Sequence, residues 1–460
     1  MLGLDLFQLS SRCRVPVCIG LGLVFSVMPQ SAEAQESDFS DPEIRPITWS
    51  TETCDSCQAA AMPCPCESCG CSQGCDDHSL PTLNELLSLP EHGIVMENNV
   101  TQFYMGVVEG GQEHEFRYSG HGDYLINADF SKMGGPEGLF LKLRAEHRFG
   151  QSMSGTTGAL LPSNVAADLP VADSEEVYLT NVLFTQMFSE NFGVFAGKTD
   201  TLDGDMNAFA HGRGIKQFSN MAFVATPIAL RSIPYSSLAT GFVWLEQGEP
   251  IFTFTVMNPT DTTRTSGFDE LFEEGVALIP ELRLPTNFFG MPGHQLFGAT
   301  WSSRTYTALD QDPRIILPNV PVAKSSDTWS LYYNFDQYLY VDPCDSKKGW
   351  GVFGRAGIAE ADTNPLEWFL SFGIGGNSVI HGRDEDTFGV GYYYAGTSDE
   401  IAPFVQNAIG GINDGQGVEM YYNIAVNRSL TITPDAQVII PARDQIDTAV
   451  LLGVRANLTF

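Results

Sequence analysis

Charged side chains occupy alternate positions in the stretch "LKLRAEHRFG". Lys142, Arg144, Glu146 and Arg148 alternate with mostly apolar residues, so an extended strand would present all four charges on one face. An apolar core does not accept such a face, because unpaired buried charges are strongly destabilising. Toward a water-filled interior, the same groups would donate hydrogen bonds to a polar solute and accept them from it.

The same alternation recurs later in the chain and supplies further candidates. Residues 329–341 and 419–427 each combine an apolar side with a polar side. Donors, acceptors and flat aromatic faces on the polar sides suit a solute rich in hydroxyl groups. The predicted pore-lining or solute-contacting residues are Arg117, Lys142, Arg144, Glu146, Arg148, Tyr332, Asp336, Arg355, Glu419 and Tyr421. The alternative for each is an ordinary polar group paired with a neighbour.

One long connecting segment, residues 199–237, offers a second set of candidates. It contains His211, Arg213, Lys216 and Phe218, and it is long enough to fold inward and narrow a channel. A solvated external loop is the alternative.

Seven cysteines lie close together in "CDSCQAAAMPCPCESCGCSQGC". They are Cys54, Cys57, Cys64, Cys66, Cys69, Cys71 and Cys75, and Cys344 follows much later. The C-x2-C spacings could hold zinc or another soft metal, whereas an oxidising compartment favours disulfides, and a linker with neither is the third possibility. Because seven is an odd number, Cys344 is a candidate disulfide partner for one member of the cluster.

Motifs for enzymatic chemistry are missing from the sequence. It contains neither G-x-S-x-G nor H-E-x-x-H, and no Gly-rich phosphate loop follows a strand. The formal net charge is −32, from 24 basic and 56 acidic residues, which argues against the basic face that nucleic acids require. We therefore expect no catalysis, no cofactor and no nucleic-acid partner.

The N-terminus has the pattern of an export signal. Arg12 and Arg14 precede the apolar run "VPVCIGLGLVFSVMP", and "SAEA" supplies a cleavage site before Gln35. The run is shorter than the roughly 20 residues that a membrane-spanning helix needs. We expect a signal peptide over residues 1–34, a Cys-rich extension with a short helix over 35–92, and the main domain over 93–460.

The main domain is predicted to be all-β, with sixteen strands. Short connections such as "SEN", "QGEP" and "NRS" alternate with long ones such as 150–174 and 199–237. This alternation is typical of a transmembrane antiparallel β-barrel in the outer membrane, and an even strand number places both chain ends in the periplasm. The expected strands are 94–107, 114–131, 138–149, 175–188, 191–198, 238–247, 250–257, 274–284, 293–306, 326–341, 349–360, 366–377, 386–396, 418–427, 429–440 and 447–460.

Several stretches together resemble the carbohydrate-selective porins of the OprB type. They include "RYSGHGDYLINADFSKMGG", "GVFAGKTDTLDGD", "GWGVFGRAGIAEADTNP", "GRDEDTFGVGYYY", "GQGVEMYYNIAV" and "LTITPDAQVIIPA". The resemblance implies a monomeric sixteen-stranded barrel that passes sugars by diffusion. It also implies that the terminal Phe460 is read by the outer-membrane assembly machinery.

The expected partners are therefore outer-membrane lipid, small sugars and the assembly machinery. Two alternatives remain. The large negative charge favours a general cation-preferring porin, and a secreted β-rich surface protein would form no pore.

Overall fold

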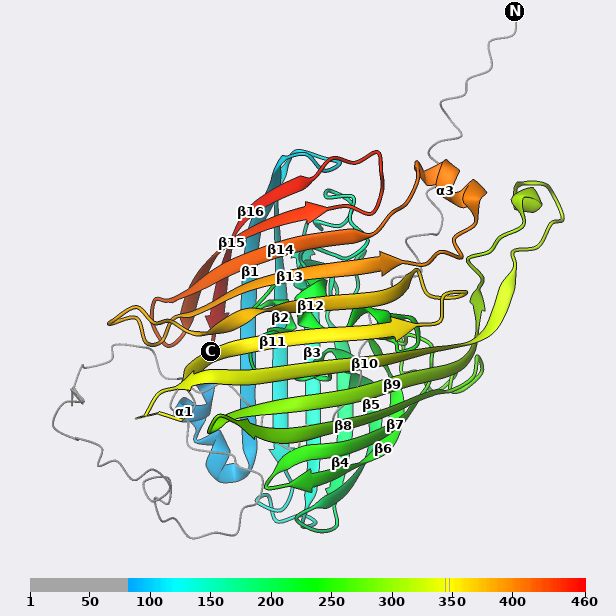
Figure 1. Ribbon diagram of the computed structural model, residues 1–460. Helices are drawn as coiled ribbons and strands as arrows, with labels where there is room; N and C mark the ends of the chain where they lie inside the picture. The colour runs from blue at the N-terminus through cyan, green and yellow to red at the C-terminus, as the bar shows by residue number, and fades with distance from the viewer. Residues whose placement is uncertain (1–81, 344, 347) are drawn as a thin grey trace, which may run out of the picture.

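The computed structural model describes residues 82–343, 345–346 and 348–460, which form a closed β-barrel (Figure 1). Successive strands are antiparallel neighbours, and β1 pairs with β16 to close the barrel. The strands are β1 (Ile94–Glu109), β2 (Phe116–Asp129), β3 (Leu139–Gly150), β4 (Tyr178–Met187), β5 (Phe192–Asp200), β6 (Ser236–Glu246), β7 (Glu249–Met257), β8 (Ala277–Phe288), β9 (Met291–Thr307), β10 (Lys324–Val341), β11 (Gly349–Ala359), β12 (Leu366–Asn377), β13 (Thr387–Thr397), β14 (Gly415–Ala425), β15 (Leu430–Ile440) and β16 (Ala449–Thr459). The predicted sixteen-stranded architecture is confirmed.

Helical segments are short and lie before β1 or in the connections between strands. The α-helices are α1 (Leu83–Leu87), α2 (Met221–Val224) and α3 (Pro403–Ile409). The 3₁₀ turns are η2 (Leu89–His92), η3 (Ala166–Asp168), η4 (Thr201–Asp203), η5 (Gly212–Gly214), η6 (Pro227–Arg231) and η7 (Pro313–Ile316). No helix in the described part of the chain is long and apolar enough to cross a membrane. The expected signal peptide, the cysteines from Cys54 to Cys75, and Cys344 lie outside the described residues.

The barrel has two unlike ends. At the turn end, short connections such as 247–248 and 289–290 join neighbouring strands, and α1 lies there beside the start of β1 (Figure 1). At the loop end the connections are longer, and two of them run into the barrel. We call residues 151–177 the companion loop and residues 201–235 the inner loop.

Alternation of side chains gives the wall its two faces. In β10, Trp329 and Leu331 are 37% and 50% exposed on the outside, whereas Ser330 and Asn334 point inward and are buried. Successive residues of a strand point to opposite faces, so one period-two sequence pattern produces both surfaces. The outward face is apolar, as a lipid-facing wall requires.

The C-terminus completes the seam between the first and last strands. Register runs from Asn99 opposite Thr459 to Glu109 opposite Val450. The backbone N–H of Phe460 donates to the carbonyl of Asn98 at 3.1 Å. Phe460 is therefore part of the closure that leaves the barrel without a free sheet edge.

An apolar core lies inside the barrel, between the inner loop and the wall. Phe218 and Phe223 of the inner loop are fully buried, with ring centroids 4.6 Å apart. Phe218 meets Tyr421 edge-on at 4.9 Å, and Phe223 meets Tyr393 at 5.8 Å. Edge-to-face contacts of this kind stabilise beyond simple burial, so they hold one side of the inner loop against β13 and β14.

Gly391 in β13 makes this close approach possible. A Cβ atom at that position would lie 2.5 Å from Cε1 of Phe223. Real Cβ contacts are not that short, so any larger residue would push the inner loop away from the wall.

Candidate functional site

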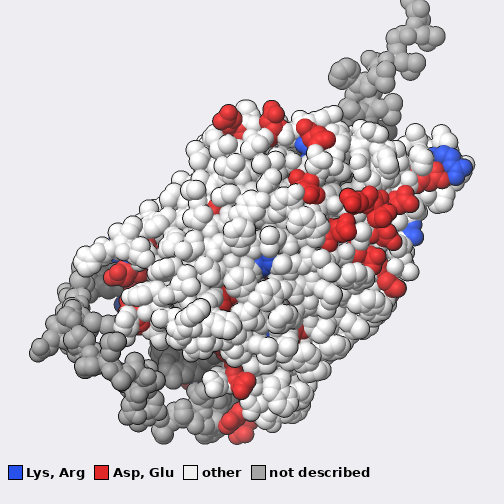
Figure 2. Space-filling model, in the orientation of Figure 1, with Lys and Arg blue, Asp and Glu red and all other residues white. Residues whose placement is uncertain are grey.

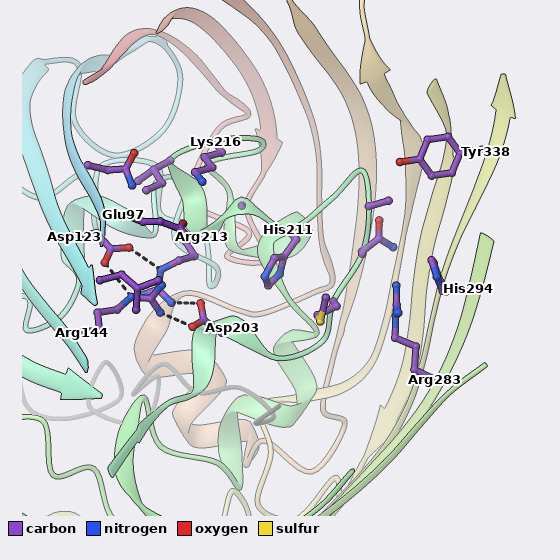
Figure 3. Close-up of a pocket in the computed structure, with 17 residues that line it drawn as sticks. Glu97, Asp123, Arg144, Asp203, His211, Arg213, Lys216, Arg283, His294 and Tyr338 are labelled. Carbon is purple, nitrogen blue, oxygen red and sulfur yellow. Dashed lines mark hydrogen bonds and ion pairs between the residues drawn. The ribbon is translucent and has the colours of Figure 1, made fainter. Parts of the chain in front are cut away.

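A cavity of about 120 Å³ lies between the inner loop and two parts of the barrel wall (Figure 3). A single water molecule needs roughly 10–15 Å³ of such space, so the cavity is large enough for several waters. Its lining residues are Glu97, Asn99, Asp123, Leu125, Arg144, Asp203, Met206, Asn207, Ala208, His211, Gly212, Arg213, Ile215, Lys216, Arg283, His294 and Tyr338. Strands β1 to β3 supply one wall, β8 to β10 supply the opposite wall, and the inner loop supplies the rest.

Arg213 links the inner loop to the first wall. Its guanidinium lies 2.7 Å from a carboxylate oxygen of Asp203, 2.6 Å from one of Glu146 and 2.7 Å from one of Asp200. Asp123 is a fourth carboxylate, 3.3 Å from Nε. Buried ion pairs are stable only when their geometry offsets the cost of desolvation, and a planar guanidinium is suited to several carboxylates at once.

Arg144 and Lys142 complete this arrangement, which we call the ion-pair cluster. Arg144 contacts Asp123 at 2.9 Å, Asp200 at 3.0 Å and Asp203 at 2.5 Å. Lys142 reaches Asp203 at 2.5 Å. The members are therefore Asp123, Lys142, Arg144, Glu146, Asp200, Asp203 and Arg213.

Asp203 lies in the inner loop, and the cluster controls its ionisation. Burial by itself would raise the pKa of the Asp203 carboxyl, but Arg144, Lys142 and Arg213 hold that pKa well below its usual value. The carboxylate therefore stays charged, which is the state that the three cations require.

The backbone around Arg213 is unusual and fits its role. Gly212, Arg213 and Gly214 have φ values of 65°, 54° and 77°. A non-glycine residue seldom occupies this left-handed region, and it stays there only where surrounding contacts fix it. The ion pairs of the guanidinium supply those contacts, so the sequence "GRG" places a cation at the inner edge of the loop.

The second wall carries its own charged group around His294. Nδ1 of His294 lies 2.8 Å from a carboxylate oxygen of Asp336, and Nε2 lies 3.2 Å from one of Glu249. Arg283 contacts the same Glu249 oxygen at 2.9 Å. A carboxylate only accepts hydrogen bonds, so a doubly protonated ring satisfies both contacts of His294.

Other predicted residues anchor the two loops at a distance from the cavity. Arg355 donates to the carbonyls of Phe223 at 2.9 Å and Ala210 at 2.6 Å. Glu419 accepts from the backbone N–H groups of Ser219 at 2.6 Å and Asn220 at 2.9 Å, at the start of α2. Both side chains point inward as expected, but they contact the inner loop.

The companion loop is held in the same way by two of the predicted arginines. Arg148 donates to the carbonyl of Ala167 at 2.7 Å and to that of Ala172 at 2.9 Å. Arg117 lies at the loop end and donates to the carbonyl of Ser152 at 2.7 Å.

The remaining predicted residues divide between the cavity and its surroundings. His211, Arg213 and Lys216 line the cavity. Phe218 and Tyr421 belong to the apolar core. Tyr332 donates to Glu281 at 2.6 Å, and Asp336 supports His294 from behind. The structure thus brings Arg144, His211, Arg213 and Lys216 together and places the others around them; whether any of them contacts a sugar stays a prediction.

Sequence reasoning missed several residues that line the cavity. These are Glu97, Asp123, Asp203, Arg283, His294 and Tyr338, among others. The alternation of polar and apolar residues in "GHGDYLINAD" could have predicted Asp123, because it lies on the same inward face of the strand as His121. No local pattern shows that β1 and β9 lie on opposite sides of one cavity.

Two carboxylates of the ion-pair cluster and the neighbouring His121 are spaced closely enough to hold a metal ion. Ligand atoms of His121, Asp123 and Glu146 lie within 4.8 Å of one another. Arg213 and Arg144 already contact the two carboxylates, and their positive charges would repel a metal ion. The donor set therefore fits ion pairing better than metal binding.

A closed barrel with an apolar outside and a narrowed polar inside defines the class of outer-membrane channels. The family model of the OprB carbohydrate-selective porins matches residues 113–460. The chain belongs to this family.

Two solved structures have the same fold. The high-pH structure of OprB from Pseudomonas putida has a TM-score of 0.70 at 18% identity, over 81% of this chain and 96% of that one. The low-pH structure of the same protein gives 0.50 at 15% identity, over 82% and 96%. No curated protein matches the chain at a significant level. The fold and family are those of transport channels.

Proposed function

We propose that the chain is an outer-membrane porin in which neutral sugars and other small solutes diffuse passively past the inner loop, through the cavity described above. The observation that carries this proposal is the cavity itself, because cationic donors and carboxylate acceptors from the loop and both walls converge on one narrow space. A sugar that loses water there regains hydrogen bonds, and weak binding at such a point still permits exit.

The orientation follows from the two ends of the barrel. Long loops of outer-membrane barrels face the outside and short turns face the periplasm, so we place the turn end and α1 in the periplasm. One barrel encloses the whole cavity, and a monomer is therefore sufficient for transport.

Liposome swelling tests the proposal directly. Liposomes containing the purified protein are diluted into isosmotic arabinose, glucose or sucrose, and the swelling rate is followed by turbidity. We expect swelling that slows as the sugar becomes larger, and none with heat-unfolded protein. Equal rates for folded and unfolded protein would contradict the proposal.

A general cation-preferring porin is the second candidate, and the charge distribution favours it. Figure 2 shows acidic side chains gathered at the loop end of the barrel. The connection between β7 and β8 carries four acidic residues close together, Asp269, Glu270, Glu273 and Glu274. Of these, Glu274 pairs with Arg304 at 2.6 Å. A negative entrance concentrates cations and depletes anions, which is compatible with passage of neutral sugars.

A further inference from the structure

The charged groups that line the cavity are of two kinds. Arg144, Arg213 and Asp203 are engaged by one another in the ion-pair cluster. Lys216 and Glu97 also line the cavity, both are partly exposed, and within the described residues neither side chain makes a hydrogen bond or ion pair. Engaged groups have their hydrogen-bonding capacity used by the protein, so the two unengaged groups are the ones available to a solute.

The position of Lys216 is fixed although its ammonium group is free. Asn423 donates to the carbonyl of Lys216 at 2.6 Å. Arg455 donates to the carbonyl of Gly214 at 3.1 Å and to that of Gln217 at 2.8 Å. The barrel wall therefore clamps the backbone on both sides of Lys216, while the ion pairs of Arg213 hold the preceding turn. A clamped backbone lowers the entropy that is lost when the side chain binds a solute.

The position of Glu97 is fixed from the other side. Glu97 lies in β1 opposite Leu125 of β2. The side chain of Asn84 in α1 donates to the carbonyl of Met96 at 2.7 Å and accepts from its N–H at 2.9 Å. This pair of hydrogen bonds fixes the strand one residue before Glu97, and Figure 3 shows Glu97 and Lys216 drawn among the residues around the cavity.

We infer that Lys216 and Glu97 form the sugar-selecting pair of this channel: the ammonium donates to one hydroxyl of a neutral sugar and the carboxylate accepts from another. The inference rests on the proposed function and assigns its specificity. Arg144 and Arg213 are then positioning residues that hold the inner loop. Opposite charges on one cavity favour a neutral polyhydroxyl solute, because an anionic sugar attracted by Lys216 is repelled by Glu97.

Current block by sugar in planar bilayers tests this inference with the full-length protein. Glucose is added at rising concentration, and the concentration that halves the ion current is compared between the wild type, Lys216→Gln and Glu97→Gln. Each variant should need roughly tenfold more glucose, because a hydrogen bond to a charged group is worth about a factor of ten or more. Lys132→Gln and Glu137→Gln, an exposed cation and an exposed anion on one turn-end connection, are matched controls that should behave as the wild type.

A structural readout separates lost contact from lost folding. Lys216→Gln and Glu97→Gln should keep the wild-type heat-modified gel shift, because neither side chain supports other protein groups. Unchanged glucose block in both variants, with block present in the wild type, would overturn the inference and leave the proposed function intact. Absence of any sugar effect in the wild type, in block and in swelling, would overturn the proposed function and the inference together.

Discussion

At the residue scale, the inward charges serve the protein before they serve a solute. The alternation in "LKLRAEHRFG" predicts that Lys142, Arg144 and Glu146 share a face, and these side chains do point inward. They contact the inner loop there in place of open water. The alternation within a strand predicts which face a side chain occupies. It does not predict the ion-pair partner, because Lys142 and Arg144 pair with residues more than fifty positions away in the sequence.

Removal of Arg213 should destabilise the inner loop strongly. Arg213→Gln leaves Glu146, Asp200 and Asp203 buried with too little positive charge, and loss of one partner of a buried ion pair costs about 3–5 kcal/mol. Because a loosened inner loop narrows the channel less, we expect a larger and noisier single-channel conductance. We also expect the barrel to unfold at a lower temperature, measured by the heat-dependent shift in detergent gels.

The matched control for this variant is an exposed arginine. Arg264→Gln removes an exposed pairing with Asp173, and such surface pairs contribute about 0–1 kcal/mol. If Arg213→Gln behaved like Arg264→Gln in both measurements, the ion-pair cluster would not be what holds the loop.

Acid should weaken the inner loop through His211. Burial lowers the pKa of His211 from its usual 6.5 to about 4. Between these two pH values the unfolded chain binds a proton at His211 that the folded chain does not bind. The contribution of neutral His211 to the free energy of unfolding is therefore complete above about pH 6.5, and it is lost as the pH falls toward about 4. The wild type should therefore lose more thermal stability than His211→Asn across this range.

Melting curves at several pH values check the prediction. His114→Asn, an exposed loop histidine, should follow the wild type. Parallel pH dependence of the wild type and His211→Asn would show that His211 is not the titrating group.

At the element scale, the strands follow from local pattern and the inserted loops do not. The expected strand 349–360 is observed as Gly349–Ala359, and 366–377 as Leu366–Asn377, because period-two alternation is visible within ten residues. For residues 199–237 the sequence predicts an inward-folding loop, with an external loop almost equally favoured. Its path depends on aromatic packing against β13 and β14, which joins parts of the chain far apart in sequence.

The packing of α2 on β13 gives an element-scale prediction. Gly391→Ala places a methyl group against Phe223, so it should displace the inner loop and change single-channel conductance. Overpacking of a filled core typically costs about 1–3 kcal/mol. Gly415→Ala is the control, since the nearest atom to its new Cβ lies at an ordinary 3.7 Å. Equal conductance of the two variants would argue against close packing of the loop on the wall.

At the scale of the whole molecule, the acidic loop end should determine ion preference. Asp269→Asn combined with Glu273→Gln should reduce cation selectivity, measured as reversal potential in a salt gradient. The effect should fade at high salt, because the screening length falls from about 10 Å at 0.1 M to about 3 Å at 1 M. The turn-end double variant Glu137→Gln with Glu190→Gln should change selectivity less; an equal change would mean that position on the barrel is irrelevant.

The central claim is passive passage of neutral sugar through this barrel, and equilibration of labelled glucose into proteoliposomes tests it most directly. Without an energy source, the internal concentration should rise to the external concentration and stop there, faster than for labelled gluconate of similar size. Failure of glucose to enter vesicles that contain folded protein, or its accumulation above the external concentration, would contradict the account.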